Sequence, residues 1–130
     1  MKRAILAALV LGMLGVPAMS VSKVIEVSPN RDVAETDGVH LRGLDTLNGT
    51  AMDLYAPVGE TIRYGHLIIT ADSCRIKSAT AVGDDHAFLR IGDVREEGLR
   101  FSGWMFASSP ALSALDHPRY DVWVVNCNRT

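Results

Sequence analysis

The chain has 130 residues, of which 13 are lysine or arginine and 15 are aspartate or glutamate, so its formal charge at pH 7 is −2. The basic residues are scattered rather than clustered, and such a chain lacks the electrostatic footprint of a nucleic-acid-binding protein. The roughly 110 residues that follow an N-terminal leader suffice for one hydrophobic core but not for two domains.

The leader has the pattern of a bacterial export signal. Met1-Lys2-Arg3 supplies a positive start, an uncharged apolar run follows from Ala4 to Val16, and small residues precede residue 21. A membrane-spanning helix needs about 20 apolar residues, whereas this run ends at Pro17. We therefore expect residues 1–20 to be a cleaved signal peptide, which leaves a periplasmic protein with no transmembrane span; an uncleaved anchor is the alternative.

Residues 21–38 mix polar and charged side chains and alternate only briefly, so they predict a flexible lead segment. A single β-rich domain is expected over residues 39–130. Its first elements are two alternating strands, Val39 to Thr46 and Thr50 to Tyr55, joined by Asn48-Gly49, a pair that tolerates the positive φ of a tight hairpin turn.

The middle of the chain continues as β structure. Thr61 to Tyr64 and Leu67 to Thr70 are predicted strands with a turn at Gly65, and residues 74–77 are expected to stay extended. From His86 to Ile91 the pattern alternates, with residues 87, 89 and 91 on one side and residues 88 and 90 on the other. Leu99 to Phe106 follows as a strand rich in large apolar side chains.

One short helix is expected near residues 109–116. Ser108 or Ser109 would cap it, and Pro110 suits a first helical position. The last strand is Asp121 to Cys127, in which strict alternation places residues 122, 124 and 126 on one face and residues 123, 125 and 127 on the other. Six to seven short strands with turns between them predict an all-β fold, a small sandwich or barrel.

The two cysteines, Cys74 and Cys127, are predicted to form a disulfide, because an even pair in an exported chain meets an oxidising compartment. A metal pair is the competing interpretation. It is weak, since neither cysteine has a second cysteine or histidine at ligand spacing.

Few residues suggest catalysis. Ser108, Ser109, His117 and Asp121 would be needed for a hydrolase, but no glycine-flanked turn marks either serine as a nucleophile. Asp84-Asp85-His86 could bind a cation only if other ligands converged there. We expect no catalytic residues, no metal site and no cofactor.

The strongest feature is the aromatic run from Phe101 to Pro110. Consecutive large side chains of a strand cannot all face one core, because neighbours alternate between faces. Two interpretations stay open: a central strand covered on both faces, or a partner-binding surface. The predicted partner-binding residues are Phe101, Trp104, Met105, Phe106, Ser109 and Pro110.

Several stretches of the chain together resemble one known family. They are Leu41-Arg42-Gly43-Leu44-Asp45, the loop Pro57-Val58-Gly59-Glu60-Thr61, Cys74, the run from Phe101 to Leu112, His117-Pro118 and Tyr120-Asp121-Val122-Trp123. On these residues the chain resembles the family called domain of unknown function 2155. The resemblance implies a small exported alphaproteobacterial protein without an assigned activity. It also implies, by gene association alone, a partner on the periplasmic side of respiratory complex I.

The leading hypothesis is therefore a non-catalytic periplasmic accessory protein that docks on a larger envelope or inner-membrane assembly. The alternative is a small periplasmic hydrolase or ligand-binding protein that uses Ser108 or Ser109 with His117.

Overall fold

The computed structural model describes residues 33–77 and 84–129, together with residues 12, 15 and 17. Apart from residues 12, 15 and 17, the predicted signal peptide lies outside the described residues, as does most of the predicted lead segment. Within the described part the elements follow in the order β1 (Ala34–Glu35), β2 (Gly38–Asp45), β3 (Thr50–Pro57), β4 (Thr61–Tyr64), β5 (Leu67–Ile76), β6 (His86–Asp93), β7 (Leu99–Phe106), the 3-10 turn η1 (Pro110–Leu112) and β8 (Tyr120–Cys127).

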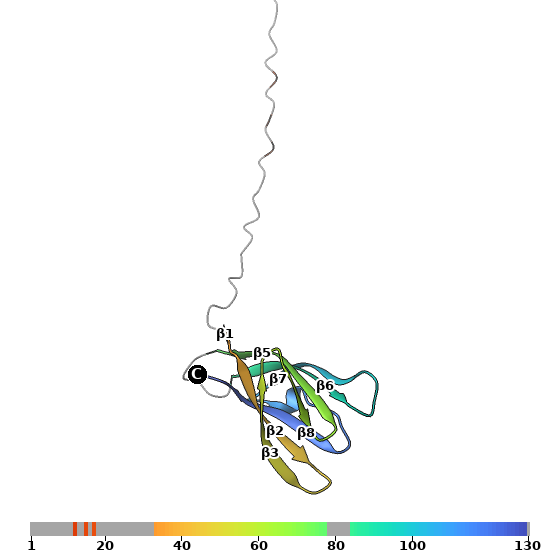
Figure 1. The fold of residues 1–130 in the computed structure, drawn as a ribbon. Coiled ribbons are helices and arrows are strands. Elements are labelled where there is room, and N and C mark those ends of the chain that lie inside the picture. Colours follow the sequence, from red (N-terminus) through yellow and green to blue (C-terminus); the bar gives the residue numbers. More distant parts are fainter. Residues whose placement is uncertain (1–11, 13–14, 16, 18–32, 78–83, 130) are drawn as a thin grey trace, which may run out of the picture.

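The strands form two antiparallel sheets, which confirms the all-β prediction. Sheet A has the order β1-β5-β6-β7, with β4 beside β5, and sheet B has the order β3-β2-β8. The sheets pack face to face: β2 and β3 lie against β5, and β8 lies against β6 and β7. The result is a small sandwich from which the β2–β3 hairpin extends (Figure 1).

The predicted turns are present where glycine permits them. Gly49 closes the β2–β3 hairpin with a φ of 70°, and Gly65 turns the chain between β4 and β5 with a φ of 57°. A Cβ atom added at Gly65 would lie 2.4 Å from the Tyr120 hydroxyl, whereas one at Gly49 would meet no atom within 4 Å. Gly65 is thus required both by its backbone conformation and by close packing.

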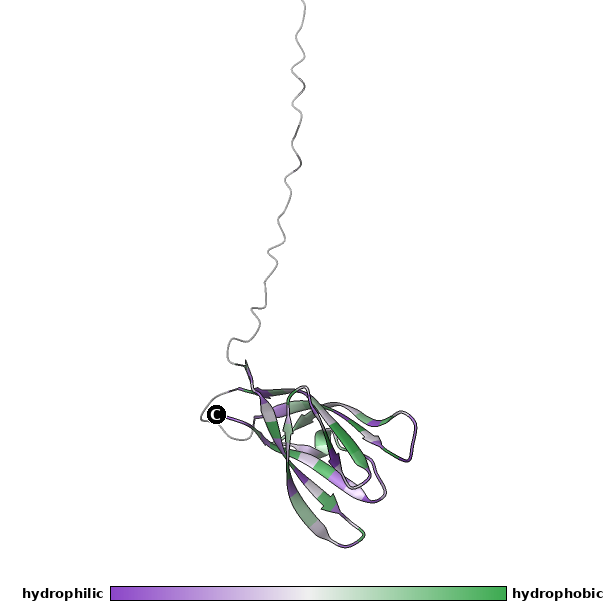
Figure 2. Ribbon diagram, viewed as in Figure 1, coloured by the Kyte–Doolittle hydropathy of each residue, from purple (hydrophilic) through white to green (hydrophobic). Residues whose placement is uncertain are grey.

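The core lies between the sheets and follows the predicted alternation. In β6, Ala87, Leu89 and Ile91 are fully buried, and Leu67 and Ile69 of the neighbouring strand β5 are buried on the same inner face of sheet A. Hydrophobic and hydrophilic residues alternate along the strands (Figure 2). Alternation therefore predicted which side of β6 is inside.

Strict alternation was wrong for the end of β8. The structure buries Val122, Val124 and Cys127, because the register with β2 slips by one residue at Val125. This β-bulge moves Cys127 to the inner face and Asn126 off it.

A second bulge does the same in β5. The register with β6 slips at Asp72, so Ala71 and Cys74 are both buried although they are three residues apart. Each cysteine thus reaches the interior through a bulge in its own strand.

Two element boundaries differ from the predictions. The expected helix over residues 109–116 is only η1, and the Ser109 side chain forms no cap hydrogen bond. Sheet A also begins before residue 39, because Ala34 and Glu35 pair with Ile76 and Arg75.

Candidate functional site

The outer face of sheet A carries four ring side chains, which we call the aromatic face: His86 and Phe88 of β6 and Trp104 and Phe106 of β7. The register pairs His86 with Phe106 and Phe88 with Trp104. Since the buried residues of both strands occupy the intervening positions, all four rings point away from the core. Phe106 is 37% exposed.

The aromatic face is held together by its own contacts. The Trp104 ring lies 5.4 Å from that of Phe88, edge to face, and 5.2 Å from the His86 ring. The Arg75 guanidinium reaches across from β5 and lies 4.9 Å from the Trp104 ring centre. Such geometry is favourable for aromatic pairs and for a cation over indole.

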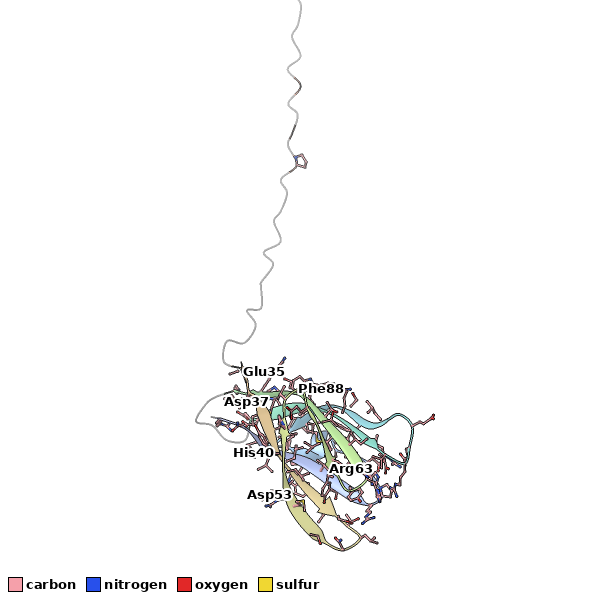
Figure 3. The ribbon with its side chains drawn as sticks, in the orientation of Figure 1. Glu35, Asp37, His40, Asp53, Arg63 and Phe88 are labelled. Carbon is pink, nitrogen blue, oxygen red and sulfur yellow. A yellow bond between two sulfur atoms is a disulfide. The ribbon has the colours of Figure 1, made fainter. Side chains whose placement is uncertain are left out.

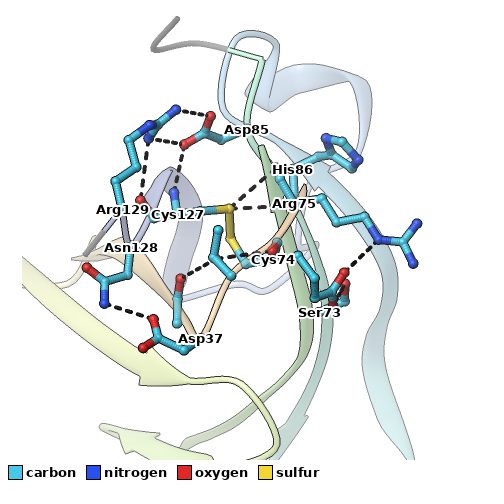
Figure 4. Close-up of a disulfide and its surroundings, with 12 residues drawn as sticks. Asp37, Ser73, Cys74, Arg75, Asp85, His86, Cys127, Asn128 and Arg129 are labelled. Carbon is cyan, nitrogen blue, oxygen red and sulfur yellow. Dashed lines mark hydrogen bonds and ion pairs between the residues drawn. A yellow bond between two sulfur atoms is a disulfide. The ribbon is translucent and has the colours of Figure 1, made fainter. Parts of the chain in front are cut away.

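Arg75 is in turn held by Glu35 of β1. Its Nε donates to Glu35 Oε2 at 2.9 Å, and the Ser73 hydroxyl donates to Oε1 (Figure 4). Partial burial acts to raise the pKa of Glu35, but these hydrogen bonds and the Arg75 charge outweigh it and lower the pKa. Glu35 and Phe88 lie at the same end of the sandwich (Figure 3).

The predicted partner-binding residues separate into two groups. Trp104, Phe106 and Pro110 reach the surface. Met105 is only 2% exposed and belongs to the core, and Phe101 packs against the core from the inner face of β7. Ser109 is half-buried in the turn after β7. Thus β7 has one face in the core and one face directed outward, and the partner-binding role of its outward residues stays a prediction.

Three contributors to this face were not among the residues predicted to bind a partner: Arg75, His86 and Phe88. The alternation of residues 86–91 placed Phe88 opposite the core side, so the signal for it was present. Arg75 left no comparable signal, because its outward direction depends on the bulge at Asp72.

A groove of about 600 Å³ lies on the other side of the sandwich, over sheet B. Arg42 and Asp53 form an exposed ion pair at 3.0 Å on its wall, and His40 packs on Tyr55 with 4.9 Å between ring centres. Its lining is His40, Leu41, Arg42, Asp53, Leu54, Ala107, Pro110, Trp123, Val124, Val125 and Asn126. The charges of Arg42 and Asp53 are paired with each other, and this lining contains no serine, threonine or cysteine that could act as a nucleophile beside His40.

The side chain of His117 is fully buried, and both of its ring nitrogens are hydrogen-bonded. Nε2 lies 3.0 Å from Asp93 Oδ2, and Nδ1 accepts the backbone amides of Arg119 and Tyr120 at 3.0 and 3.1 Å. Because Nδ1 is an acceptor, the proton must be on Nε2, which donates to Asp93. This ring has no free lone pair with which to activate Ser108 or Ser109.

Asp93 is the centre of this buried cluster. Its carboxylate, whose side chain is 0% exposed, also accepts two bonds from the Arg95 guanidinium and one from the Arg95 amide. The Arg95 and His117 hydrogen bonds lower the pKa of Asp93 far below its usual range. The cluster therefore closes one end of the sandwich and is structural.

The Asp84-Asp85-His86 stretch does not converge on a cation. Asp85, 1% exposed, accepts the Cys127 amide at 2.8 Å and both Arg129 Nη atoms, whereas His86 belongs to the aromatic face (Figure 4). Among the described residues no group of three or more histidines, cysteines, aspartates or glutamates is placed to hold a metal ion.

The predicted disulfide is present. Cys74 of β5 and Cys127 of β8 are bonded, with 5.7 Å between their Cα atoms, and the bond joins sheet A to sheet B. In the described part of the chain no helix is long and apolar enough to span a membrane.

Comparison with known proteins gives a family and no activity. The family model described as "Uncharacterized protein conserved in bacteria (DUF2155)" matches residues 39–127. The chain is also similar to "Uncharacterized protein RP359" of Rickettsia prowazekii (strain Madrid E), with 27% identity over 88 residues. That match covers 65% of this chain and 56% of the relative, so the chain spans little more than half of the relative's length. No solved structure matches.

Proposed function

This chain belongs to the family of uncharacterized bacterial proteins DUF2155, and we propose that it is a non-catalytic accessory protein of the periplasm that docks on a larger envelope or inner-membrane assembly. The observation that carries the proposal is the outward direction of Trp104, Phe106 and Phe88 on sheet A. Aromatic side chains of this kind often anchor protein interfaces.

The aromatic face suits this role in two ways. Its rings are prearranged by mutual contacts and by Arg75, so little side-chain freedom would be lost on binding. It also lies on the regular strands β6 and β7 rather than on a loop, which holds its shape in the absence of a partner.

The periplasmic location is supported by the disulfide and by the export pattern of residues 1–20. Stable disulfides are typical of oxidising compartments such as the periplasm. The narrower proposal is that the assembly is respiratory complex I, at its periplasmic side; it comes from gene association within the family.

A pull-down tests the proposal. The tagged protein is recovered from solubilised native membranes, and co-purifying proteins are identified by mass spectrometry. We expect one assembly to be enriched, and Trp104→Ala to reduce its recovery at least about tenfold, because truncating an anchor of an interface costs about 2 kcal/mol or more.

The matched control is Trp123→Ala, which removes the other tryptophan from the outer face of sheet B. It should leave recovery unchanged. Recovery of nothing above background, or equal losses for the two variants, would falsify the docking proposal. Enrichment of an assembly other than complex I would reject only the narrower one.

A further inference from the structure

The outer edge of β7 carries main-chain groups that none of the described strands uses. The Ala107 amide donates to the Asp85 carbonyl at 2.9 Å, which makes these residues a hydrogen-bonded pair of the β6–β7 ladder. Hydrogen-bonded and non-hydrogen-bonded pairs alternate along an antiparallel ladder. The next residues of β7 that are hydrogen-bonded to β6 are therefore Met105 and Gly103. The amides and carbonyls of Ser102 and Trp104 therefore point away from β6.

In the part of the chain that the structure describes, β7 is the last strand of sheet A on this side. It has eight residues and contains neither proline nor lysine, two of the residues with which proteins commonly protect an edge. The opposite edge is divided between β1 and β4, which have two and four residues. Gly103 is half-buried rather than buried, and since a glycine has only main chain, the backbone is reachable at the middle of β7.

The outward side chains of β7 are complementary to those of a second, antiparallel β7 strand whose Gly103 lies opposite Gly103 of the first. An antiparallel copy centred there sets Trp104 opposite Ser102 of the second copy, so a large ring faces a small side chain. Arg90 flanks Ser102 in the ladder, and its guanidinium is turned away from the β7 edge toward β5, where it binds Asp72. By symmetry each contact forms twice.

We propose that two copies of this chain pair through their β7 edges, antiparallel and centred on Gly103, into one continuous sheet. Ser102 and Trp104 of each copy exchange main-chain hydrogen bonds with Trp104 and Ser102 of the other. The two aromatic faces then lie on the same side of the joined sheet. This inference goes beyond the docking proposal and does not depend on it, because it concerns the purified protein alone.

Sedimentation or light scattering over a concentration series tests the pairing. We expect the measured mass to rise to twice that of one chain. Ser102→Pro should return it to that of one chain, because proline removes an outward amide that the β6 ladder does not use. Ala51→Pro is the matched control, since the register of β3 with β2 also turns the Ala51 amide outward, on an edge of sheet B. It should leave the mass doubled.

Cysteine cross-linking tests the register without relying on proline. A Cβ at Gly103 meets only Phe101, at 3.6 Å, so Gly103→Cys is tolerated. In the proposed pairing the Cα atoms of the two Gly103 residues lie about 4.5 Å apart, a separation that a disulfide can bridge. The two Ser102 residues do not lie opposite each other. Gly103→Cys should give covalent dimers under oxidation and Ser102→Cys should not.

A mass of one chain across the whole series overturns the proposal. So does a loss of the dimer in Ala51→Pro as large as in Ser102→Pro, or cross-linking through residue 102 in place of residue 103. Each variant is first checked for the intact Cys74–Cys127 disulfide and for a cooperative melt. Loss of partner recovery from membranes would bear on docking and leave this result unaffected.

Discussion

Asp93 and His117 show how single side chains complete this fold. They are separated by 24 residues in the chain, yet the Asp93 carboxylate binds both Arg95 and His117. The Asp93 side chain is wholly shielded from solvent. A buried carboxylate is tolerated only when its charge is paired and its oxygens are hydrogen-bonded. His117 in turn positions the start of β8, because its Nδ1 accepts the backbone amides of Arg119 and Tyr120.

Asp93→Asn is expected to destabilise the protein in a pH-dependent way. In the folded state the pKa of Asp93 is lowered, chiefly by Arg95 and then by His117. The Asp93 carboxylate therefore stabilises the folded state fully above the ordinary carboxyl pKa of about 4, and this contribution is lost as the pH falls below that value. Urea unfolding should therefore show a large gap between parent and variant near neutral pH, which narrows progressively below about pH 4.

Glu97→Gln is the control for Asp93→Asn, because Glu97 is an exposed acidic residue of the same β6–β7 loop. Its unfolding free energy should follow that of the parent at every pH. A difference in unfolding free energy between the parent and Asp93→Asn that stays constant from neutral to acid pH would contradict the electrostatic role of Asp93.

The connection from β7 to β8 is the element that the sequence described least well. It starts at the end of β7 and must return to the beginning of β8, beside Asp45 at the other end of the sandwich. An extended residue advances about 3.3 Å and a helical one about 1.5 Å, so an extended path suits this return. The helix-like pattern of residues 109–116 is thus reduced to η1, and Leu115 enters the core.

Two leucines of this connection provide a test of its path. Leu115 is 6% exposed and Leu112 is 76% exposed. Leu115→Ala should lower the unfolding free energy by about 2–4 kcal/mol, because it leaves a cavity in the core. Leu112→Ala should change it by less than about 0.5 kcal/mol. Equal effects in urea denaturation would show that the connection does not pack as described.

At the scale of the whole molecule, the disulfide links the two sheets across the core. It closes a loop with a sequence separation of 53, from β5 to β8. In the chain-entropy treatment, a loop of this length stabilises the fold by roughly 4 kcal/mol. That is a large share of the stability of a small domain.

The double substitution Cys74→Ala with Cys127→Ala should therefore lower the unfolding free energy by roughly 4 kcal/mol, measured by urea denaturation. Reductant should destabilise the parent by a similar amount and leave the double variant unchanged. If reduced and oxidised parent unfold at the same urea concentration, the bond contributes little to stability.

The sequence alone determined the all-β class, most strand positions, the Asn48-Gly49 hairpin turn and the pairing of Cys74 with Cys127. These are local or compositional properties: a two-residue period, residues that accept positive φ, and an even cysteine pair in a chain with an export pattern. These signals can be recognised in the sequence without knowing which strands are neighbours.

Tertiary packing sets the side that each residue faces after a bulge, and it brings together residues that are distant in the chain. The slips at Asp72 and Val125 turn both cysteines inward, although the residue types at these positions do not mark a bulge. Likewise, the outward direction of Trp104 depends on which face of β7 the opposite sheet covers. Alternation within a strand sets two faces, but packing between sheets chooses which of them is buried.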